Sequence, residues 1–212
     1  MLGYYIPYDI SKVLDKYEID RANCVAETLK ILNRLGIAIS YENVLEYARD
    51  KSSVGRFDIA RALKGMGYVK SKNEAYGIYL DHGGKSYVKR NKLTPFELAK
   101  KIRECGGVPV LAHPKSLRLH DDELYPFIKK LAESGLCGIE VYNPNNSQEK
   151  RKKYMELCDE FGLIYTAGSD YHGGKRKPVI EIGKGIKDNL NITDMRIIER
   201  LKEKKREIDL SG

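Results

Sequence analysis

Hydrophobic residues recur with a helical spacing in the first half of the chain. They repeat every three or four positions over residues 20–35, and Gly36 follows as a residue that commonly ends helices. The same spacing predicts a second helix that Ser40 can cap and a third helix over residues 55–66. A stretch rich in tyrosine and glycine comes next, and only residues 2–6 resemble a strand. The first half is therefore predicted to be mainly helical.

The pattern changes near residue 94, where short apolar runs begin to alternate with helical segments. The apolar runs, at 108–112, 138–142 and 163–167, are predicted to be buried strands. The predicted helices lie at residues 94–106, 122–134, 147–161 and 193–208. Alternating strands and helices joined by short loops indicate an α/β fold with a parallel sheet. Three such units are too few to close a barrel but enough for part of one.

The composition of the 212 residues is that of an ordinary globular protein, with 42% hydrophobic and 32% charged residues. No apolar run is long enough to cross a membrane, and charged residues interrupt the first thirty positions, where a signal peptide would be apolar. The four cysteines are scattered, which favours reduced core thiols and a cytoplasmic location. The net charge of +8 raises the expectation of a phosphate-bearing partner, although a solvated basic surface would explain it equally well.

Residues that can bind metals follow two of the predicted strands. His113 comes directly after the first strand, and Asp170 and His172 follow the third. Because parallel strands place their carboxyl ends on one rim, these side chains are expected to converge there. Imidazole and carboxylate groups bind Zn, Mn or Fe, and residues two apart in an extended segment face the same side. The alternative is that His113 packs against Pro114 and that Asp170 caps a turn.

Three segments that contain these strands, 107–114, 138–142 and 168–173, together resemble the later motifs of the polymerase and histidinol phosphatase (PHP) superfamily. Residues 53–63 and 79–88 narrow the match, because they resemble the helical insertion found in its branch of small metal-dependent phosphoesterases.

The resemblance implies a distorted (β/α)7 TIM-like barrel, of which this chain would hold the C-terminal part. Residues 1–9 would be a barrel strand remnant, 10–92 a helical insertion subdomain and 93–212 the C-terminal barrel portion. It also implies a hydrolase that cleaves phosphate esters with a hydroxide activated by divalent metal ions, either Mn, Zn or Fe. The expected substrate is a phosphorylated small molecule such as a nucleotide, or the end of a short oligonucleotide, and no membrane partner is expected.

The family's functional residues map onto five positions of this sequence. His113, Asp170 and His172 would be metal ligands, and no catalytic group beyond them is implied. Arg56 would contact substrate phosphate through its bidentate guanidinium, and Lys85 in a Gly-Gly-Lys loop would be a second contact. An ordinary ion pair near a helix start is the alternative for Arg56.

Several of the family's metal motifs are missing from the sequence. There is no His-x-His segment near the start, and Met1 stands where relatives carry a histidine before the strand of residues 2–4. Asp58 replaces a histidine that many relatives carry, and a carboxylate would repel a phosphate. We therefore expect the isolated chain to be weakly active or inactive.

The missing segments also leave alternatives for assembly and function. Unpaired strand edges lead us to expect a homo-oligomer or a complementing N-terminal segment. The alternative function is a non-catalytic PHP remnant that binds phosphate, nucleic acid or a partner protein. A histidinol-phosphatase-like enzyme is a third reading, but the helical insertion fits it less well.

Overall fold

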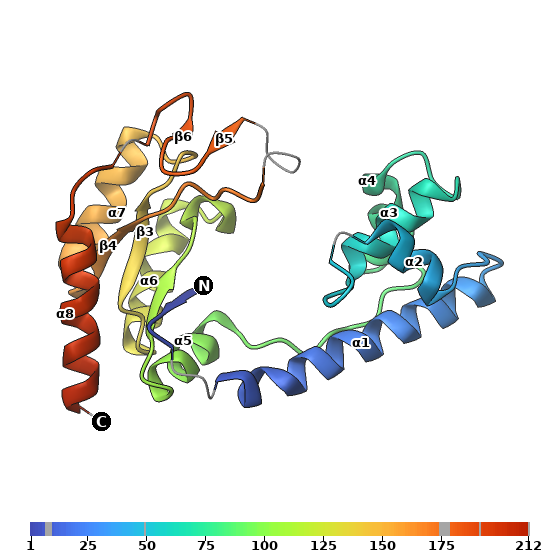
Figure 1. Cartoon of the computed structure of the whole chain (residues 1–212), viewed down its shortest axis with the longest axis horizontal. Coiled ribbons are helices and arrows are strands. Elements are labelled where there is room, and N and C mark those ends of the chain that lie inside the picture. Colours follow the sequence, from blue (N-terminus) through green and yellow to red (C-terminus); the bar gives the residue numbers. More distant parts are fainter. Residues whose placement is uncertain (7–9, 49, 174–178, 191, 212) are drawn as a thin grey trace. The chain divides into compact units, whose positions relative to one another are not determined.

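The computed structural model describes residues 1–6, 10–48, 50–173, 179–190 and 192–211. Its internal contacts divide the chain into two units (Figure 1). Unit 1 comprises Met1–Ile10 together with Leu93–Gly212, and unit 2 comprises Ser11–Lys92. Among the described residues, none of the helices combines the length and the apolar character that crossing a bilayer requires.

Unit 1 is built on a sheet of four strands in the order β1-β2-β3-β4. The strands are β1 (Leu2–Tyr4), β2 (Val108–Leu111), β3 (Gly138–Tyr142) and β4 (Ile164–Ala167). β1 pairs with β2 in the antiparallel sense, whereas β2, β3 and β4 are parallel to one another. The prediction of an α/β fold with a parallel sheet is confirmed, and each parallel strand lies within one residue of its expected bounds. The partial barrel stays a prediction.

Helices cover the two faces of this sheet because its residues alternate between them. On one face, Leu111, Ile139 and Val141 pack with apolar residues of α6 (Asp121–Glu133) and α7 (Gln148–Phe161). On the other face, Val108, Val110 and Ile164 form a separate cluster with Leu201 and Ile208 of α8 (Arg196–Ser211).

The remaining elements of unit 1 are short or lie at its start. α5 (Pro95–Glu104) begins within one residue of its predicted start; Thr94 caps it and Pro95 lies in its first turn. A 3-10 turn, η2 (Pro114–Leu117), follows β2, and β5 (Ile180–Glu181) pairs with β6 (Gly185–Ile186) in a separate hairpin. The sequence patterns did not predict the turn or the hairpin, whose strands are only two residues long.

The described residues of unit 2 form helices joined by loops, as predicted. It contains nearly all of α1 (Ile10–Arg34), with α2 (Tyr41–Tyr47), α3 (Arg56–Gly65), α4 (Lys72–Ala75) and the π-helical turn η1 (Tyr76–Leu80). Its core is separate from those of unit 1; it joins one face of α1 to buried residues of the shorter helices, among them Leu32, Val44, Ile59, Leu63 and Leu80.

Two features of unit 2 differ from the sequence prediction. α1 begins about ten residues earlier than its strongest apolar periodicity indicates. The stretch rich in tyrosine and glycine, for which no element was predicted, begins with η1, which follows directly after α4. Burial of Ala75 and Leu80 in the core explains this second difference, because tertiary packing overrides the low helix propensity of glycine.

Candidate functional site

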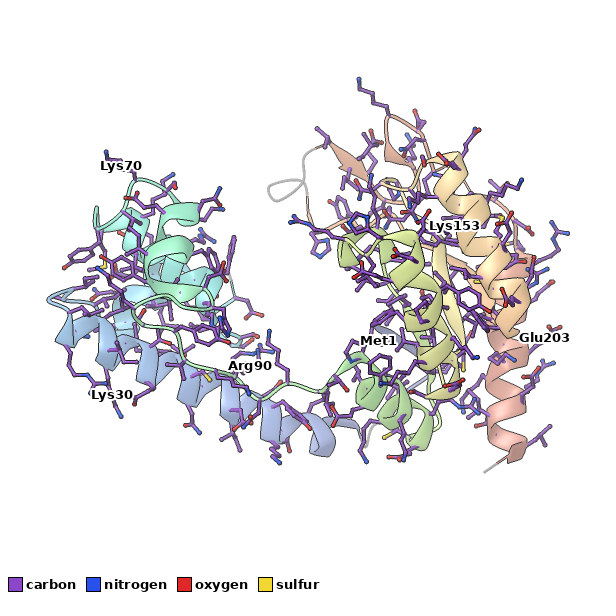
Figure 2. All side chains as sticks on the ribbon, turned by 180° about the vertical axis from the view of Figure 1, so that it is seen from behind. Met1, Lys30, Lys70, Arg90, Lys153 and Glu203 are labelled. Carbon is purple, nitrogen blue, oxygen red and sulfur yellow. The ribbon has the colours of Figure 1, made fainter. Side chains whose placement is uncertain are left out.

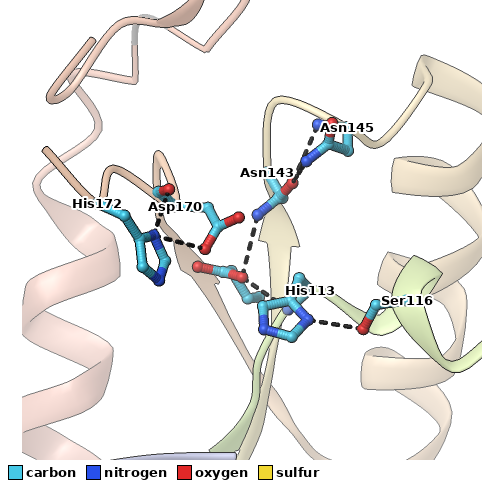
Figure 3. A network of polar contacts seen from close by, with 7 residues as sticks. His113, Ser116, Asn143, Asn145, Asp170 and His172 are labelled. Atoms are coloured by element: carbon cyan, nitrogen blue, oxygen red, sulfur yellow. Dashed lines mark hydrogen bonds and ion pairs between the residues drawn. The ribbon is translucent and has the colours of Figure 1, made fainter. Parts of the chain in front are cut away.

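The three predicted metal ligands line one cleft at the carboxyl ends of the parallel strands, which we call the strand-end cleft (Figure 3). Its volume is about 460 Å³. The residues that line it are His113, Lys115, Ser116, Asn143, Asn145, Asp170 and His172. His113 follows β2, Asn143 follows β3, and Asp170 and His172 follow β4. The strands are paired in parallel, so their ends meet at this rim as topology predicts.

Two of these residues have left-handed backbone conformations. His113 has φ 31° and Asp170 has φ 54°, a region that residues other than glycine seldom occupy. Each residue sits where the chain leaves a strand, so the unusual turn sets the direction in which its side chain starts. Such conformations persist only where the surroundings enforce them, and they are frequent at functional sites.

Buried Glu140 on β3 supplies part of that enforcement. Its Oε2 accepts a hydrogen bond from the backbone N–H of His113 at 2.7 Å and another from Asn143 Nδ2 at 3.2 Å. Burial raises the pKa of Glu140, these two hydrogen bonds oppose the increase, and the charge of Asp170 adds to it. A Cβ atom added to Gly168 would overlap with Glu140 Oε1, so glycine is required where β4 ends. The carboxylate therefore bonds to the chain that follows β2 and β3, and it lies against the glycine that follows β4.

Glu140 has a positioning role that the sequence prediction did not assign. It is only 4% exposed, and it stands in a strand whose other residues are mostly apolar. A carboxylate in the middle of a buried strand is costly unless it has hydrogen-bond partners. That conflict between residue type and position is the signal that would have found it.

The imidazoles of the cleft are held by different neighbours. His113 Nδ1 shares a hydrogen bond with Ser116 Oγ at 2.7 Å, which leaves Nε2 as the nitrogen for a ligand. His172 Nδ1 lies 2.8 Å from the backbone oxygen of Asp170 and 3.4 Å from its Oδ1 (Figure 3). Asp170 and His172 are thus neighbours, and His113 lines the same cleft from another strand.

The chemistry of these donors suits a divalent cation, but the set is incomplete. Across the parts of the chain that the structure describes, no three His, Cys, Asp or Glu side chains form a group positioned to hold a metal ion. Two imidazoles and one carboxylate in one cleft are nevertheless the donor types that Zn, Mn and Fe take. The residues are therefore of the types that bind such a metal, but they do not form a complete coordination sphere.

The two predicted substrate contacts, Arg56 and Lys85, lie in unit 2, and only Arg56 lines a pocket. Arg56 lines a second cavity of about 310 Å³, which we call the basic pocket because Arg21, Arg90 and Lys92 also line it. The Arg56 guanidinium lies over the Tyr87 ring, 4.6 Å from its centroid, and donates to the backbone oxygen of Val88. Lys85 has an exposed side chain and is not among the residues that line this pocket. The sequence did not single out Arg21, Arg90 or Lys92, which come together only through helix packing.

Asp58 has a structural role. The family resemblance led us to expect that its carboxylate would disfavour phosphate. Its Oδ2 accepts a hydrogen bond from the backbone N–H of Gly55 at 3.1 Å, which caps the start of α3. Its side chain is 9% exposed and does not line the basic pocket. The carboxylate is therefore occupied by the helix start rather than directed at a ligand.

Comparison with curated proteins finds phosphoesterases. The chain is 29% identical over 152 residues to the phosphoribosyl 1,2-cyclic phosphate 1,2-diphosphodiesterase of Eggerthella lenta, covering 70% of this chain and 56% of that protein. It is 27% identical over 141 residues to the 3',5'-nucleoside bisphosphate phosphatase of Chromobacterium violaceum (66% and 50%). It is also 27% identical over 165 residues to a 5'-3' exoribonuclease of Haemophilus influenzae (77% and 57%). The chain spans about half the length of these relatives.

Two solved structures share the fold, and one of them carries a phosphoesterase assignment. A protein of Bifidobacterium adolescentis, provisionally assigned as a metal-dependent phosphoesterase, matches with a TM-score of 0.67 and 25% identity over 93% of this chain and 68% of its own. An amidohydrolase of Chromobacterium violaceum with bound sulfate shares the fold, with a TM-score of 0.65 and 24% identity over 80% of this chain and 61% of its own. No family model matches the chain. The chain is a relative of phosphoesterases, and at that level its resemblance to the PHP superfamily is confirmed.

Proposed function

We propose that this chain is the C-terminal part of a metal-dependent phosphoesterase that cleaves nucleotides or the ends of short oligonucleotides. One observation carries the proposal: His113, Asp170 and His172, from two different strand ends, line a single cleft. The support from relatives is that a diesterase, a nucleotide phosphatase and an exoribonuclease all align with more than half of the chain.

In this proposal His113, Asp170 and His172 hold a divalent cation, either Mn, Zn or Fe. When bound, such a cation supplies positive charge to the oxygens of a phosphate ester. Ser116 orients His113 through its Nδ1, and Glu140 fixes the backbone from which His113 starts. Lys115 lines the cleft with its Nζ bound to the Asn145 backbone oxygen at 2.9 Å, so it can attract an anionic substrate.

Because the metal ligands in the cleft are too few, the proposal also includes an assembly with another segment or chain. Further ligands would come from outside the described residues, as a complementing N-terminal segment or a second copy of the chain. The sheet would then be part of a distorted TIM-like barrel, and β1 would be an edge available for pairing. Arg56 and Lys85 are proposed as phosphate contacts, with Arg56 the stronger of the two because it lines a pocket.

Metal analysis of the full chain tests the proposed ligands. After incubation with Mn or Zn and removal of excess ion, the wild-type chain should retain metal, and His113→Ala should retain at least about tenfold less. His120→Ala is the matched control, because His120 is exposed and does not line the strand-end cleft. Equal metal content in the wild type and His113→Ala would remove His113 from the site.

A second candidate function, a non-catalytic remnant that binds phosphate, is favoured by one observation. No three metal-binding side chains are grouped within the described ranges. This candidate predicts phosphate binding without metal retention and without hydrolysis of an aryl phosphate. The same metal analysis, combined with an aryl phosphate assay, distinguishes the two functions.

A further inference from the structure

We propose that the basic pocket of unit 2 is a phosphate-binding site in its own right, in which Arg21 and Arg90 join Arg56 and which needs no metal. The ligand is a phosphate monoester dianion or a pair of linked phosphates. Phosphate binding in this pocket does not depend on the proposed function. A role of the pocket in substrate selection does rest on the proposed function.

The first support is the gathering of cations from distant parts of the sequence. Arg21 comes from α1, Arg56 is the first residue of α3, and Arg90 and Lys92 come from the segment after η1. Figure 2 labels Arg90 on this segment, where its Nη2 donates to the Tyr17 backbone oxygen of α1 at 3.3 Å. The three guanidinium side chains are partly buried, and Lys92 is exposed. Four cations therefore share one cavity of about 310 Å³.

The second support is that these charges are not neutralised. Within the residues that the structure describes, none of the four cations forms an ion pair. The contacts of the arginines are to neutral oxygens: Arg21 to Ser53 Oγ, Arg56 to the Val88 carbonyl and Arg90 to the Tyr17 carbonyl. The Nε atoms of Arg21 and Arg90 are buried without a hydrogen-bond partner. A buried donor without a partner is costly, and an anion would remove that cost.

The electrostatics agree with an anion site. Burial lowers the pKa of Arg90, and repulsion from Arg21 and, to a smaller extent, Arg56 lowers it further, whereas Cys24 and Asp20 oppose the shift. Clustered guanidinium groups repel one another, and a phosphate dianion replaces that repulsion with attraction. Their planar forks match phosphate oxygens in pairs, which a single ammonium group cannot do.

The start of α3 adds to the field in the pocket. Gly55, the residue before this ten-residue helix, lines the pocket, and a Cβ atom at this position would meet no other atom within 4 Å. The start of α3 therefore lies at the cavity, and the Asp58 carboxylate that caps it offsets part of the positive end of the helix dipole. The helix start is thus a minor part of the site, which the three arginines define.

Calorimetric titration of the full chain in EDTA, with pyrophosphate and then inorganic phosphate as probes, tests the site. The wild-type chain should bind one pyrophosphate saturably, and Arg90→Gln should weaken binding at least about tenfold. Lys92→Gln, at an exposed residue whose loss leaves the fold intact, should weaken it about threefold. Arg34→Gln is the control, since it removes one charge from the same helix α1 but lies outside the pocket and pairs with Glu27.

The outcomes separate this proposal from the proposed function. Absence of saturable binding, or equal weakening by Arg34→Gln and Lys92→Gln, would overturn the pocket as a phosphate site. Pyrophosphate binding that persists in His113→Ala, whether or not the chain hydrolyses any ester, supports it. If the chain hydrolyses an ester and its pyrophosphate affinity is unchanged in Arg90→Gln and Lys92→Gln, the proposed function is retained. The phosphate site in the basic pocket is then rejected.

Discussion

The strand-end cleft of unit 1 and the basic pocket of unit 2 have opposite chemistry. The cleft gathers two imidazoles, a carboxylate and two amides, which are ligands for cations. The basic pocket gathers three guanidinium groups and an ammonium group, which are ligands for anions. Cleavage of a phosphate ester needs both kinds of group, one around a metal and one around phosphate oxygens. The cation ligands gather in unit 1, where Lys115 is the one lysine or arginine among the described residues that line the cleft, and the guanidinium groups gather in the pocket of unit 2.

The two sites are also built in different ways. In unit 1 the candidate ligands follow strands, and a buried carboxylate holds the backbone of one of them, His113. In unit 2 the cations start from helices and from an extended segment, and an apolar core of its own holds these elements together. The contrast means that each site depends on a separate core, so one can be disrupted without the other.

The largest expected effect comes from truncating one core at a time. Leu63 and Leu131 are both fully buried, Leu63 in the core of unit 2 and Leu131 in the α6–α7 core of unit 1. Replacing either by alanine should cost about 2–5 kcal/mol of unfolding free energy. Leu63→Ala should weaken pyrophosphate binding and spare metal retention, and Leu131→Ala should do the reverse. Urea unfolding, combined with the two binding assays, measures this.

Loss of the site in one unit after a substitution in the core of the other would show that the units are not independent. If Leu63→Ala abolished metal retention as completely as Leu131→Ala does, the cores would unfold as one and the two sites would not be separable. A conservative pair, Leu63→Met and Leu131→Met, keeps most of the side-chain volume and should leave both binding assays nearly unchanged.

A smaller effect is expected at the junction between β4 and Glu140. Gly168→Ala places a methyl group against Glu140 Oε1, and the adjustment should cost about 1–3 kcal/mol of unfolding free energy. Because Glu140 also holds the His113 backbone, metal retention should fall together with stability. Gly77→Ala is the control, since nothing lies within 4 Å of the added atom and alanine favours helix. Unchanged metal retention in Gly168→Ala would separate Glu140 from the site.

Strand topology explains why the cleft of unit 1 was predictable from the sequence. Three apolar runs with intervening helices imply parallel strands, and parallel strands bring the residues that follow them to one rim. The sequence therefore predicts that His113, Asp170 and His172 converge on one rim. Glu140 was missed as a positioning residue because its role depends on hydrogen bonds to the chain after two neighbouring strands.

The basic pocket was predictable only in part, for a physical reason. Arg56 was singled out by the family resemblance, but Arg21 and Arg90 are far from it in sequence and line the same pocket only through the packing of unit 2. Helical periodicity says which face of a helix is buried and does not say which polar residues of different helices meet. Lys85 illustrates the converse, because its loop resembled a motif while its side chain lies outside the pocket.

The smallest expected effect comes from the cap of α5 in unit 1 and should leave both sites intact. Thr94 Oγ1 accepts from the Glu97 backbone N–H at 3.2 Å, and Glu97 Oε2 accepts from the Thr94 backbone N–H at 2.7 Å. Thr94→Ala should cost about 1 kcal/mol of unfolding free energy at neutral pH, as measured by urea unfolding. Ser147→Ala at the start of α7 is the matched control, because the residue bonded to its side chain is Lys150 rather than a carboxylate.

The two caps should differ in their response to pH. Hydrogen bonds from the backbone and side chain of Thr94 lower the pKa of Glu97, so the stability they give is present above the ordinary glutamate pKa. That stability is lost as the pH falls through the lowered pKa of the folded state. The difference between wild type and Thr94→Ala should therefore shrink in acid, whereas the difference for Ser147→Ala should stay constant. A cost for Thr94→Ala that did not change with pH would mean that the Glu97 carboxylate takes no part in the cap.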